Sequence, residues 1–174
     1  EEANIGWLNS SNQFIFEQEA LTMWGVSGGF EVAYNKVLNS KREGIDVKLG
    51  RNGTIHRNRV QGVGSDDYIG ISHPGVGIYL DGRKEPMYGI SIYNNIVSSN
   101  VGIGIRVSTE RPLTTVANDV YNIQVYNNLV HGNGSAGLAV GDRARNVNVY
   151  HNTFAQNNKG FIIKTYYPLD EPTL

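Results

Sequence analysis

The sequence predicts an all-β chain wound into a parallel β-helix, and three observations predict it. A glycine followed by apolar side chains at alternate positions recurs along the chain, which is the period-2 pattern of a strand with one buried face. A second pattern, an asparagine flanked by alternating apolar residues, precedes each glycine strand. No segment shows the helical period. In a chain of 174 residues the glycine pattern occupies 44–48, 77–81, 104–108, 137–141 and 160–164.

The asparagines recur at one position of each repeat. In three of the five repeats the first apolar residue of the glycine strand follows the asparagine by 10 residues (35 to 45, 95 to 105, 128 to 138). Three short strands per coil, stacked in register on the next coil, explain this spacing. Stacked buried amides bond to one another, as in cross-β ladders. The predicted ladder contains Asn35, Asn58, Asn95, Asn128 and Asn152.

Aromatic residues also recur, two positions before the ladder asparagine. Tyr93, Tyr126 and Tyr150 occupy this position, and His56 replaces tyrosine in one coil. An outward aromatic stack at the corner of the coil explains them without a functional site.

The repeat is weaker at the ends of the chain. Residues 21–24 fit the glycine strand with Ala20 in place of glycine, so we count about six coils, with Asn12 in the first and Ile5 and Trp7 in an incomplete strand before it. Pro168 and Pro172 prevent another paired strand. We expect one domain over 1–174, with clear repeats from 12 to 165. Its uncapped ends predict a piece of a longer chain, or self-association end to end or laterally.

Composition narrows the choice of partners. The net charge is −1 and the basic residues are dispersed in the sequence, which argues against nucleic acid or an anionic membrane as the main partner. No apolar run approaches the roughly 18 residues of a membrane span. The given residues contain no signal peptide and no cysteine.

The paired patterns resemble the right-handed parallel β-helix repeat of the pectin-lyase-like superfamily, over about residues 12 to 165. That superfamily contains polysaccharide lyases, polygalacturonase-type hydrolases, uronan epimerases and uncharacterised surface proteins. The resemblance implies a right-handed coil with three sheets. It also implies that substrate binds in the groove on the sheet of glycine strands. The repeat encodes the scaffold and not the chemistry, so it leaves the activity open.

The outward positions of the glycine strands vary, and stacking places them in two columns. One column contains Thr22, Asp46, Tyr79, Arg106, Ala139 and Ile162; the other contains Trp24, Lys48, Asp81, Ser108, Gly141 and Lys164. Long connections flank the same coils, and insertions in repeat folds map to the binding face. These connections add Asp66, Asp67, Tyr68, His73 and Arg83 to the predicted site.

Three mechanisms fit these residues. In a lyase, Lys48 or Arg106 would remove a proton while Asp46 and Asp81 hold Ca²⁺ or pair with the cations, although Asp81 would raise the pKa of Lys48 and weaken it as a base. In a hydrolase, Asp46 and Asp81 lie about 8 Å apart on a diagonal, compatible with an inverting pair. His73 is a further catalytic candidate.

In a binding module, Trp24 and Tyr79 would offer flat faces to a sugar ring, with charged groups as orienting contacts. The contact residues would include Asp66, Asp67, Tyr68 and Arg83. Cross-strand ion pairing on an exposed sheet is the structural alternative for the charges.

The sequence therefore predicts a carbohydrate-active β-helix that binds an extracellular, acidic polysaccharide, and it leaves open whether the protein also cleaves that polysaccharide by β-elimination or hydrolysis. The alternative is a non-catalytic surface, adhesion or structural module. Ca²⁺ is the one cofactor that the candidate residues indicate, and the sugar is left open. Because the function that the sequence predicts is binding of an extracellular polysaccharide, we expect an extracellular, cell-surface or periplasmic location.

Overall fold

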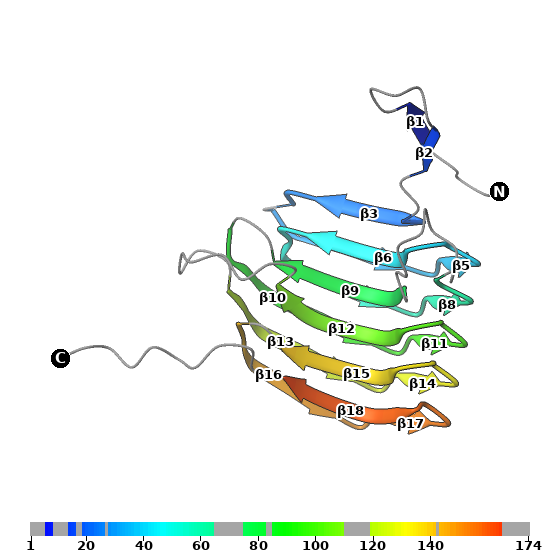
Figure 1. Ribbon diagram of the computed structural model, residues 1–174. Helices are drawn as coiled ribbons and strands as arrows, with labels where there is room; N and C mark the ends of the chain where they lie inside the picture. The colour runs from blue at the N-terminus through cyan, green and yellow to red at the C-terminus, as the bar shows by residue number, and fades with distance from the viewer. Residues whose placement is uncertain are drawn as a thin grey trace.

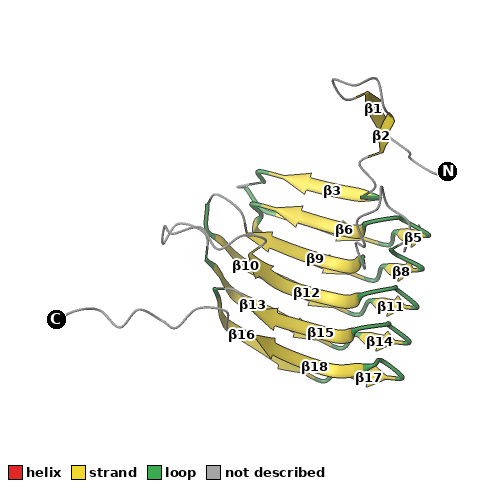
Figure 2. Ribbon diagram, in the orientation of Figure 1, coloured by secondary structure: helices red, strands yellow, loops and turns green. Residues whose placement is uncertain are grey.

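A computed structural model describes residues 6–8, 14–16, 19–26, 28–64, 75–82, 85–109, 119–141 and 143–164. In these residues all regular structure is β-strand, and three parallel sheets stack coil upon coil around one core (Figures 1 and 2). The chain runs from one sheet to the next at each corner. The predicted parallel β-helix is confirmed.

Sheet I contains the glycine strands, and its six strands form the face seen in front in Figure 1. They are β3 (Leu21–Trp24), β6 (Glu43–Lys48), β9 (Val76–Gly82), β12 (Ile103–Thr109), β15 (Ala136–Gly141) and β18 (Lys159–Lys164).

Sheets II and III lie on either side of the asparagine corner, and each has five strands. Sheet II contains β4 (Phe30–Ala33), β7 (Arg51–His56), β10 (Met87–Tyr93), β13 (Val120–Tyr126) and β16 (Ala144–Tyr150). Sheet III contains β5 (Lys36–Leu38), β8 (Arg59–Gln61), β11 (Ile96–Ser98), β14 (Leu129–His131) and β17 (Thr153–Ala155).

The first two strands depart from the prediction. Instead of an incomplete coil, β1 (Gly6–Leu8) and β2 (Phe14–Phe16) pair antiparallel, so Trp7 belongs to a hairpin. The parallel stack of described residues begins with β3.

The core consists of the inward residues of the three sheets, stacked on residues of the same class. Ile45, Ile78, Ile105 and Leu138 lie in register on successive strands of sheet I, and all four are fully buried. Burying aliphatic side chains of this size stabilises the fold by about 1.5–3 kcal/mol each. The constant positions of the repeat therefore form the interior.

Close packing at one corner explains why each inner repeat begins with glycine. A Cβ atom on Gly77 would lie 2.5 Å from Cγ1 of Val97 and 2.6 Å from the carbonyl oxygen of Gly104. A Cβ atom on Gly104 would meet Val130 at the same 2.5 Å. The chain passes so close to the valine column of sheet III that this position has no room for a side chain.

The predicted asparagine ladder is present. Nδ2 of Asn58 donates to Oδ1 of Asn95 at 3.0 Å, and Nδ2 of Asn95 donates to Oδ1 of Asn128 at 3.0 Å. Each ladder asparagine follows a residue in the left-handed conformation, such as Asn94 with φ 54°. The ladder satisfies buried amides that a sharp corner would leave without partners.

A second ladder, which we did not predict, occupies the corner between sheets III and I. Nδ2 of Asn100 donates to Oδ1 of Asn133 at 2.8 Å, and Asn133 donates in the same way to Asn157. Each lies five positions after a ladder asparagine (95 to 100, 128 to 133, 152 to 157). That spacing was visible in the sequence.

The aromatic stack is confirmed on the outer face of sheet II. Ring centroids are 4.7 Å apart for His56 and Tyr93, and 5.0 Å apart for each of the next two pairs, Tyr93–Tyr126 and Tyr126–Tyr150. The rings are nearly parallel, so their faces cover one another. This arrangement accounts for the tyrosines as structural residues.

Candidate functional site

The predicted columns are present on the outer face of sheet I. Asp46 is in register with Tyr79, and Tyr79 with Arg106; Trp24 is in register with Lys48, and Lys48 with Asp81. The side chains of these residues point away from the core, because the alternate positions of the same strands are the core residues. The sequence argument for the geometry of this face is therefore correct.

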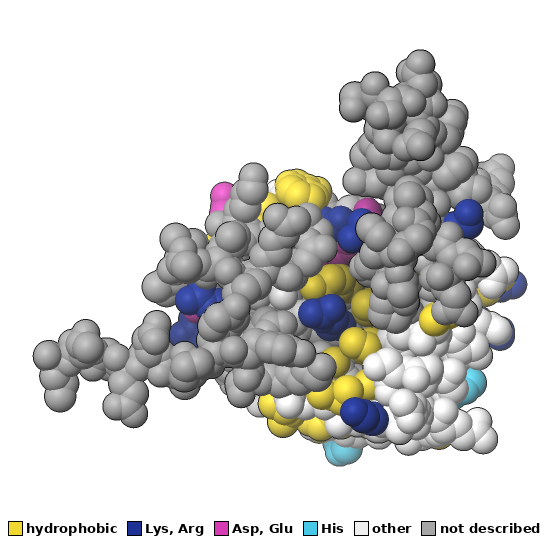
Figure 3. All heavy atoms as spheres, in the orientation of Figure 1, with side chains coloured by type: hydrophobic (Ala, Val, Ile, Leu, Met, Phe, Trp, Pro, Cys, Tyr) yellow, Lys and Arg dark blue, Asp and Glu magenta, His cyan; other side chains and the backbone are white. Residues whose placement is uncertain are grey.

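The side chains on this face are deeply buried. We expected a groove lined by these residues, and Asp46, Lys48, Tyr79 and Asp81 are only 1%, 5%, 4% and 0% exposed. Trp24, at 56%, is the most accessible of the predicted site residues in the described part of the chain. Figure 3 shows hydrophobic and basic groups side by side on the part of this face that is visible. Charged groups buried this deeply need partners.

Lys48 is an ion-pair partner of the buried Asp46 carboxylate. Its Nζ lies 2.8 Å from Oε1 of Glu19 and 2.8 Å from Oδ2 of Asp46. Thr22 donates to the other oxygen of Glu19 at 3.0 Å. Oδ1 of Asp46 is buried and has no hydrogen-bond partner among the residues that the structure describes. The ammonium group therefore bridges two carboxylates that come from neighbouring coils.

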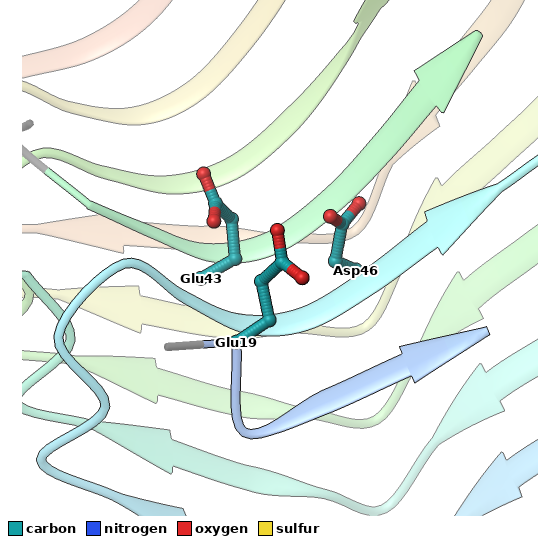
Figure 4. Close-up of side chains that lie close together, drawn as sticks. All are labelled: Glu19, Glu43 and Asp46. Carbon is teal, nitrogen blue, oxygen red and sulfur yellow. The ribbon is translucent and has the colours of Figure 1, made fainter. Parts of the chain in front are cut away.

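Glu43 joins these two carboxylates, and Figure 4 shows the three side chains on the same side of the sheet. Ligand oxygens of Glu19, Glu43 and Asp46 all lie within 4.8 Å of one another. Arg42 approaches Glu43 at 3.4 Å and Glu19 at 3.9 Å. We call Glu19, Glu43, Asp46 and Lys48 the carboxylate cluster.

Burial and mutual repulsion separate the pKa values in this cluster. Burial raises the pKa of Glu43 to about 8, against the attraction of Arg42 and with help from the charges of Asp46 and Glu19. Burial raises the pKa of Asp46 to about 7, although Lys48 opposes it. Burial also acts on Glu19, but Lys48, Thr22 and Arg42 together lower its pKa. The cluster therefore holds protonated and ionised carboxyl groups side by side at neutral pH.

The environment of Lys48 disfavours its predicted role as a base. Burial tends to lower its pKa, but Asp46 and Glu19 outweigh burial and raise it. A lysine that stays charged cannot accept a proton at neutral pH. In this structure Lys48 is the cation that holds two carboxylates.

Arg106 is positioned by its neighbours in the two columns. Its guanidinium lies 5.0 Å from the centroid of the Tyr79 ring, and its Nε donates to Oγ of Ser108 at 2.8 Å. The Ser108 hydroxyl donates in turn to the Tyr79 hydroxyl at 3.4 Å. Arg106 is half-buried, and its contacts with Tyr79 and Ser108 fix the position of its positive charge.

The predicted metal pair of Asp46 and Asp81 stays a prediction. Among the described residues, the three carboxylates Glu19, Glu43 and Asp46 converge. Oxygen ligands of this kind suit Ca²⁺. Lys48, however, already forms ion pairs with two of the three carboxylates, each at 2.8 Å.

The predicted loop residues Asp66, Asp67, Tyr68, His73 and Arg83 lie outside the described residues. Their predicted roles stay predictions. Lys164 lies in β18, and the structure describes only its backbone.

Sequence reasoning missed Glu19 and Glu43, although a signal was present. Glu43 directly precedes the glycine of its repeat, and Glu19 precedes Ala20, which replaces that glycine. Later coils have Val76, Ile103 and Ala136 at this position. Extending the comparison of columns by one position would have found them.

A family model described as a right handed beta helix region matches residues 9–167. No curated protein matches the chain, and no solved structure matches it. Among the residues that the structure describes, no helix has the length and apolar character needed to cross a membrane.

Proposed function

The chain belongs to the right-handed β-helix family, and from that premise we propose that the outer face of sheet I, from β3 to β12, binds an acidic polysaccharide. One observation carries the proposal: Trp24, 56% exposed, lies beside a lysine that two buried carboxylates hold in place. An exposed aromatic ring next to a fixed polar network is the arrangement that sugar-binding sites use.

Trp24 would supply the apolar contact. The Nζ atom of Lys48 lies 5.7 Å from the centroid of the Trp24 ring, so a sugar that stacks on the indole would lie next to a positive charge. That charge favours a uronic acid or another acidic sugar over a neutral one. The carboxylate cluster limits the motion of Lys48, which lowers the entropic cost of binding.

Arg106 would supply a second cationic contact. It lies on β12, three strands from Trp24 on β3, which corresponds to about 14 Å along the stack. A short oligosaccharide can span that length. Arg106 is already oriented by Tyr79 and Ser108, so few degrees of freedom are lost on binding.

Cleavage of the bound chain is the second candidate function, and the pKa values favour it. A hydrolase needs one protonated carboxyl group and one carboxylate close together. Asp46, with its pKa raised to about 7, and Glu19, with its pKa lowered, have oxygens within 4.8 Å of one another. This separation is nearer to that of retaining glycosidases, about 5–5.5 Å, than to an inverting pair. The raised pKa of Lys48 argues against β-elimination with this residue as the base.

The test combines binding with product analysis. Polygalacturonate, alginate and a neutral glucan are titrated against the protein with and without Ca²⁺, while absorbance of 4,5-unsaturated products and reducing ends are followed. We expect an acidic polymer to bind, and Trp24→Ala to weaken binding about tenfold or more. Tyr150→Ala, at an exposed aromatic residue of sheet II, is the matched control and should bind normally.

Product analysis decides between binding and cleavage. If reducing ends form, Asp46→Asn and Glu19→Gln should each stop their formation while weakening binding less than Trp24→Ala does. Equal binding by wild type and Trp24→Ala would contradict the site, and tighter binding of the neutral glucan would contradict the proposed ligand.

A further inference from the structure

The corner between sheets II and III contains a surface pocket of about 370 Å³, separate from the face of sheet I. It lies at the asparagine corner of the first coils, where β5, β8 and β11 are stacked in Figure 1. Its lining residues are Tyr34, Asn35, Lys36, Arg57, Asn58, Arg59, Asn94 and Ile96.

Three of the lining residues are cations: Arg57 and Arg59 lie on either side of Asn58 in the sequence, and Lys36 comes from the preceding coil. Lys36 is in register with Arg59 on the neighbouring strand, about 4.8 Å away, and Arg57 precedes the ladder residue Asn58. All three are exposed. The coiling of the chain thus places Lys36 next to the two arginines.

These cations lack an acidic partner in the described part of the chain. Glu31 is the one carboxylate on the six strands that flank the pocket, β4, β5, β7, β8, β10 and β11, and its Oε1 is bound to His56 at 2.7 Å. Arg57 and Arg59 instead donate to neutral oxygens, the Tyr34 hydroxyl and Oε1 of Gln61, each at 3.0 Å. The pocket therefore has a positive charge that the fold does not neutralise.

The same contacts hold the two arginines in place. The Arg57 guanidinium lies 5.6 Å from the centroid of the Tyr34 ring. Tyr34, Arg57 and Asn94 occupy the same left-handed position of successive coils, with φ of 60°, 53° and 54°. A regular corner thus fixes the backbone of both the aromatic and the cationic residues, which lowers the entropy lost on binding.

We propose that this pocket binds an oxyanion, a sulfate or carboxylate group, carried on the sugar ring of an acidic polysaccharide. Guanidinium groups suit such groups because they donate paired hydrogen bonds in one plane. Tyr34, which is 72% exposed, places an aromatic ring beside them for the sugar itself. The proposal extends polysaccharide binding to a second surface, and it depends on none of the residues of sheet I.

A polysaccharide fits these features better than a nucleic acid. Nucleic-acid sites use an extended positive surface that follows many phosphates. Here three cations converge on one pocket, and the net charge of the chain is −1.

The experiment uses three polymers with one backbone: dextran, carboxymethyl-dextran and dextran sulfate. Binding is measured with the whole chain at several salt concentrations, and a double-stranded DNA oligonucleotide forms a further arm. We expect at least one charged dextran to bind and neutral dextran not to bind. The preferred derivative then distinguishes a carboxylate from a sulfate ligand.

Variants that remove cationic side chains test whether the charged polymer binds in this pocket. Arg57→Gln/Arg59→Gln should weaken binding of the preferred polymer by about tenfold or more, and Lys36→Gln by a smaller factor, with weaker salt dependence in both. Arg145→Gln/Lys159→Gln removes the same two charges from exposed positions at the far end of the stack, and should bind normally. Circular dichroism and thermal unfolding verify that each variant is folded.

Three outcomes would overturn the proposal. They are the absence of binding to either charged dextran, an equal loss in the Arg145/Lys159 control, and tighter binding of DNA that depends on Arg57 and Arg59. Trp24→Ala, measured in parallel, reports on the face of sheet I. The two proposals therefore fail independently.

Discussion

At the scale of single residues, burial converts ordinary acidic side chains into groups that titrate near neutral pH. Asp46 is 1% exposed and Glu43 is 3% exposed, and two other carboxylates lie close enough to each to raise its pKa further. Removing a carboxylate from water disfavours its charged form. Glu43 and Asp46 therefore stay protonated at pH values well above the usual pKa of such side chains.

These shifts predict how stability depends on pH. In the folded state the pKa of Glu43 is raised from 4.5 to about 8 and that of Asp46 from 3.8 to about 7. Between about pH 4 and pH 8 the folded protein therefore binds protons that the unfolded chain has already lost. The free energy of unfolding is expected to fall as the pH rises through this range.

The double variant Glu43→Gln/Asp46→Asn tests this prediction. Neutral amides imitate the protonated acids, so the variant should match wild type near pH 3, below both unfolded pKa values, and exceed its stability at pH 8 by at least about 2 kcal/mol. Urea unfolding at both pH values measures the difference. Glu85→Gln, at a carboxylate whose side chain is 61% exposed, is the control. If the double variant keeps the wild-type pH dependence, the pKa assignments are wrong.

At the scale of elements, the close approach of sheets I and III governs the turn before each glycine strand. The glycine column meets the valine column of sheet III and the backbone of the next coil. Backbone oxygens cannot move aside as the end of a flexible side chain can. The glycine is therefore required by packing at each inner coil.

Alanine substitution along this column should show a position-dependent cost. At Gly104 a new Cβ would lie 2.5 Å from Val130 and 2.7 Å from the Gly137 carbonyl oxygen, so Gly104→Ala should lower the free energy of unfolding by about 2 kcal/mol. At Gly160, in the last coil, the nearest atom would be 4.0 Å away. Gly160→Ala should change stability by less than about 0.5 kcal/mol. Equal effects in chemical unfolding would contradict the packing argument.

At the scale of the whole molecule, the last coil of the described stack has exposed apolar side chains. The core columns continue into Phe161 and Ile163, which are 44% and 70% exposed. Strands β16, β17 and β18 each pair with one neighbour among the described strands. Exposed strand edges beside apolar side chains favour association with another chain.

We therefore expect concentration-dependent self-association through this end of the stack. Ile163→Glu should reduce it, because a charge would replace an apolar contact at the end. Leu38→Glu changes an apolar residue that is 42% exposed on the side of the stack, and should leave association unchanged. Sedimentation velocity over a range of concentrations measures both. The opposite result would indicate lateral association.

Particular residues show which features of the structure can be predicted from the sequence. The repeated Gly-Ile pattern and the asparagine spacing predicted the coil, the core columns and the placement of Asp46, Tyr79 and Arg106 in one line, all of which the structure contains. In a stacked repeat, equivalent positions become neighbours in space, so sequence periodicity and three-dimensional register carry the same information.

Tertiary structure alone decided the electrostatics. Burial of Asp46 and Lys48, their contacts with Glu19 and the meeting of Lys36 with Arg57 and Arg59 depend on which coils lie side by side and how much water each group loses. Periodicity states which positions face outward, but not how accessible they are. The sequence by itself determined the scaffold and its register. Folding determined which charged side chains form ion pairs and which carboxyl groups hold a proton. These properties depend on desolvation and on every neighbouring charge at once.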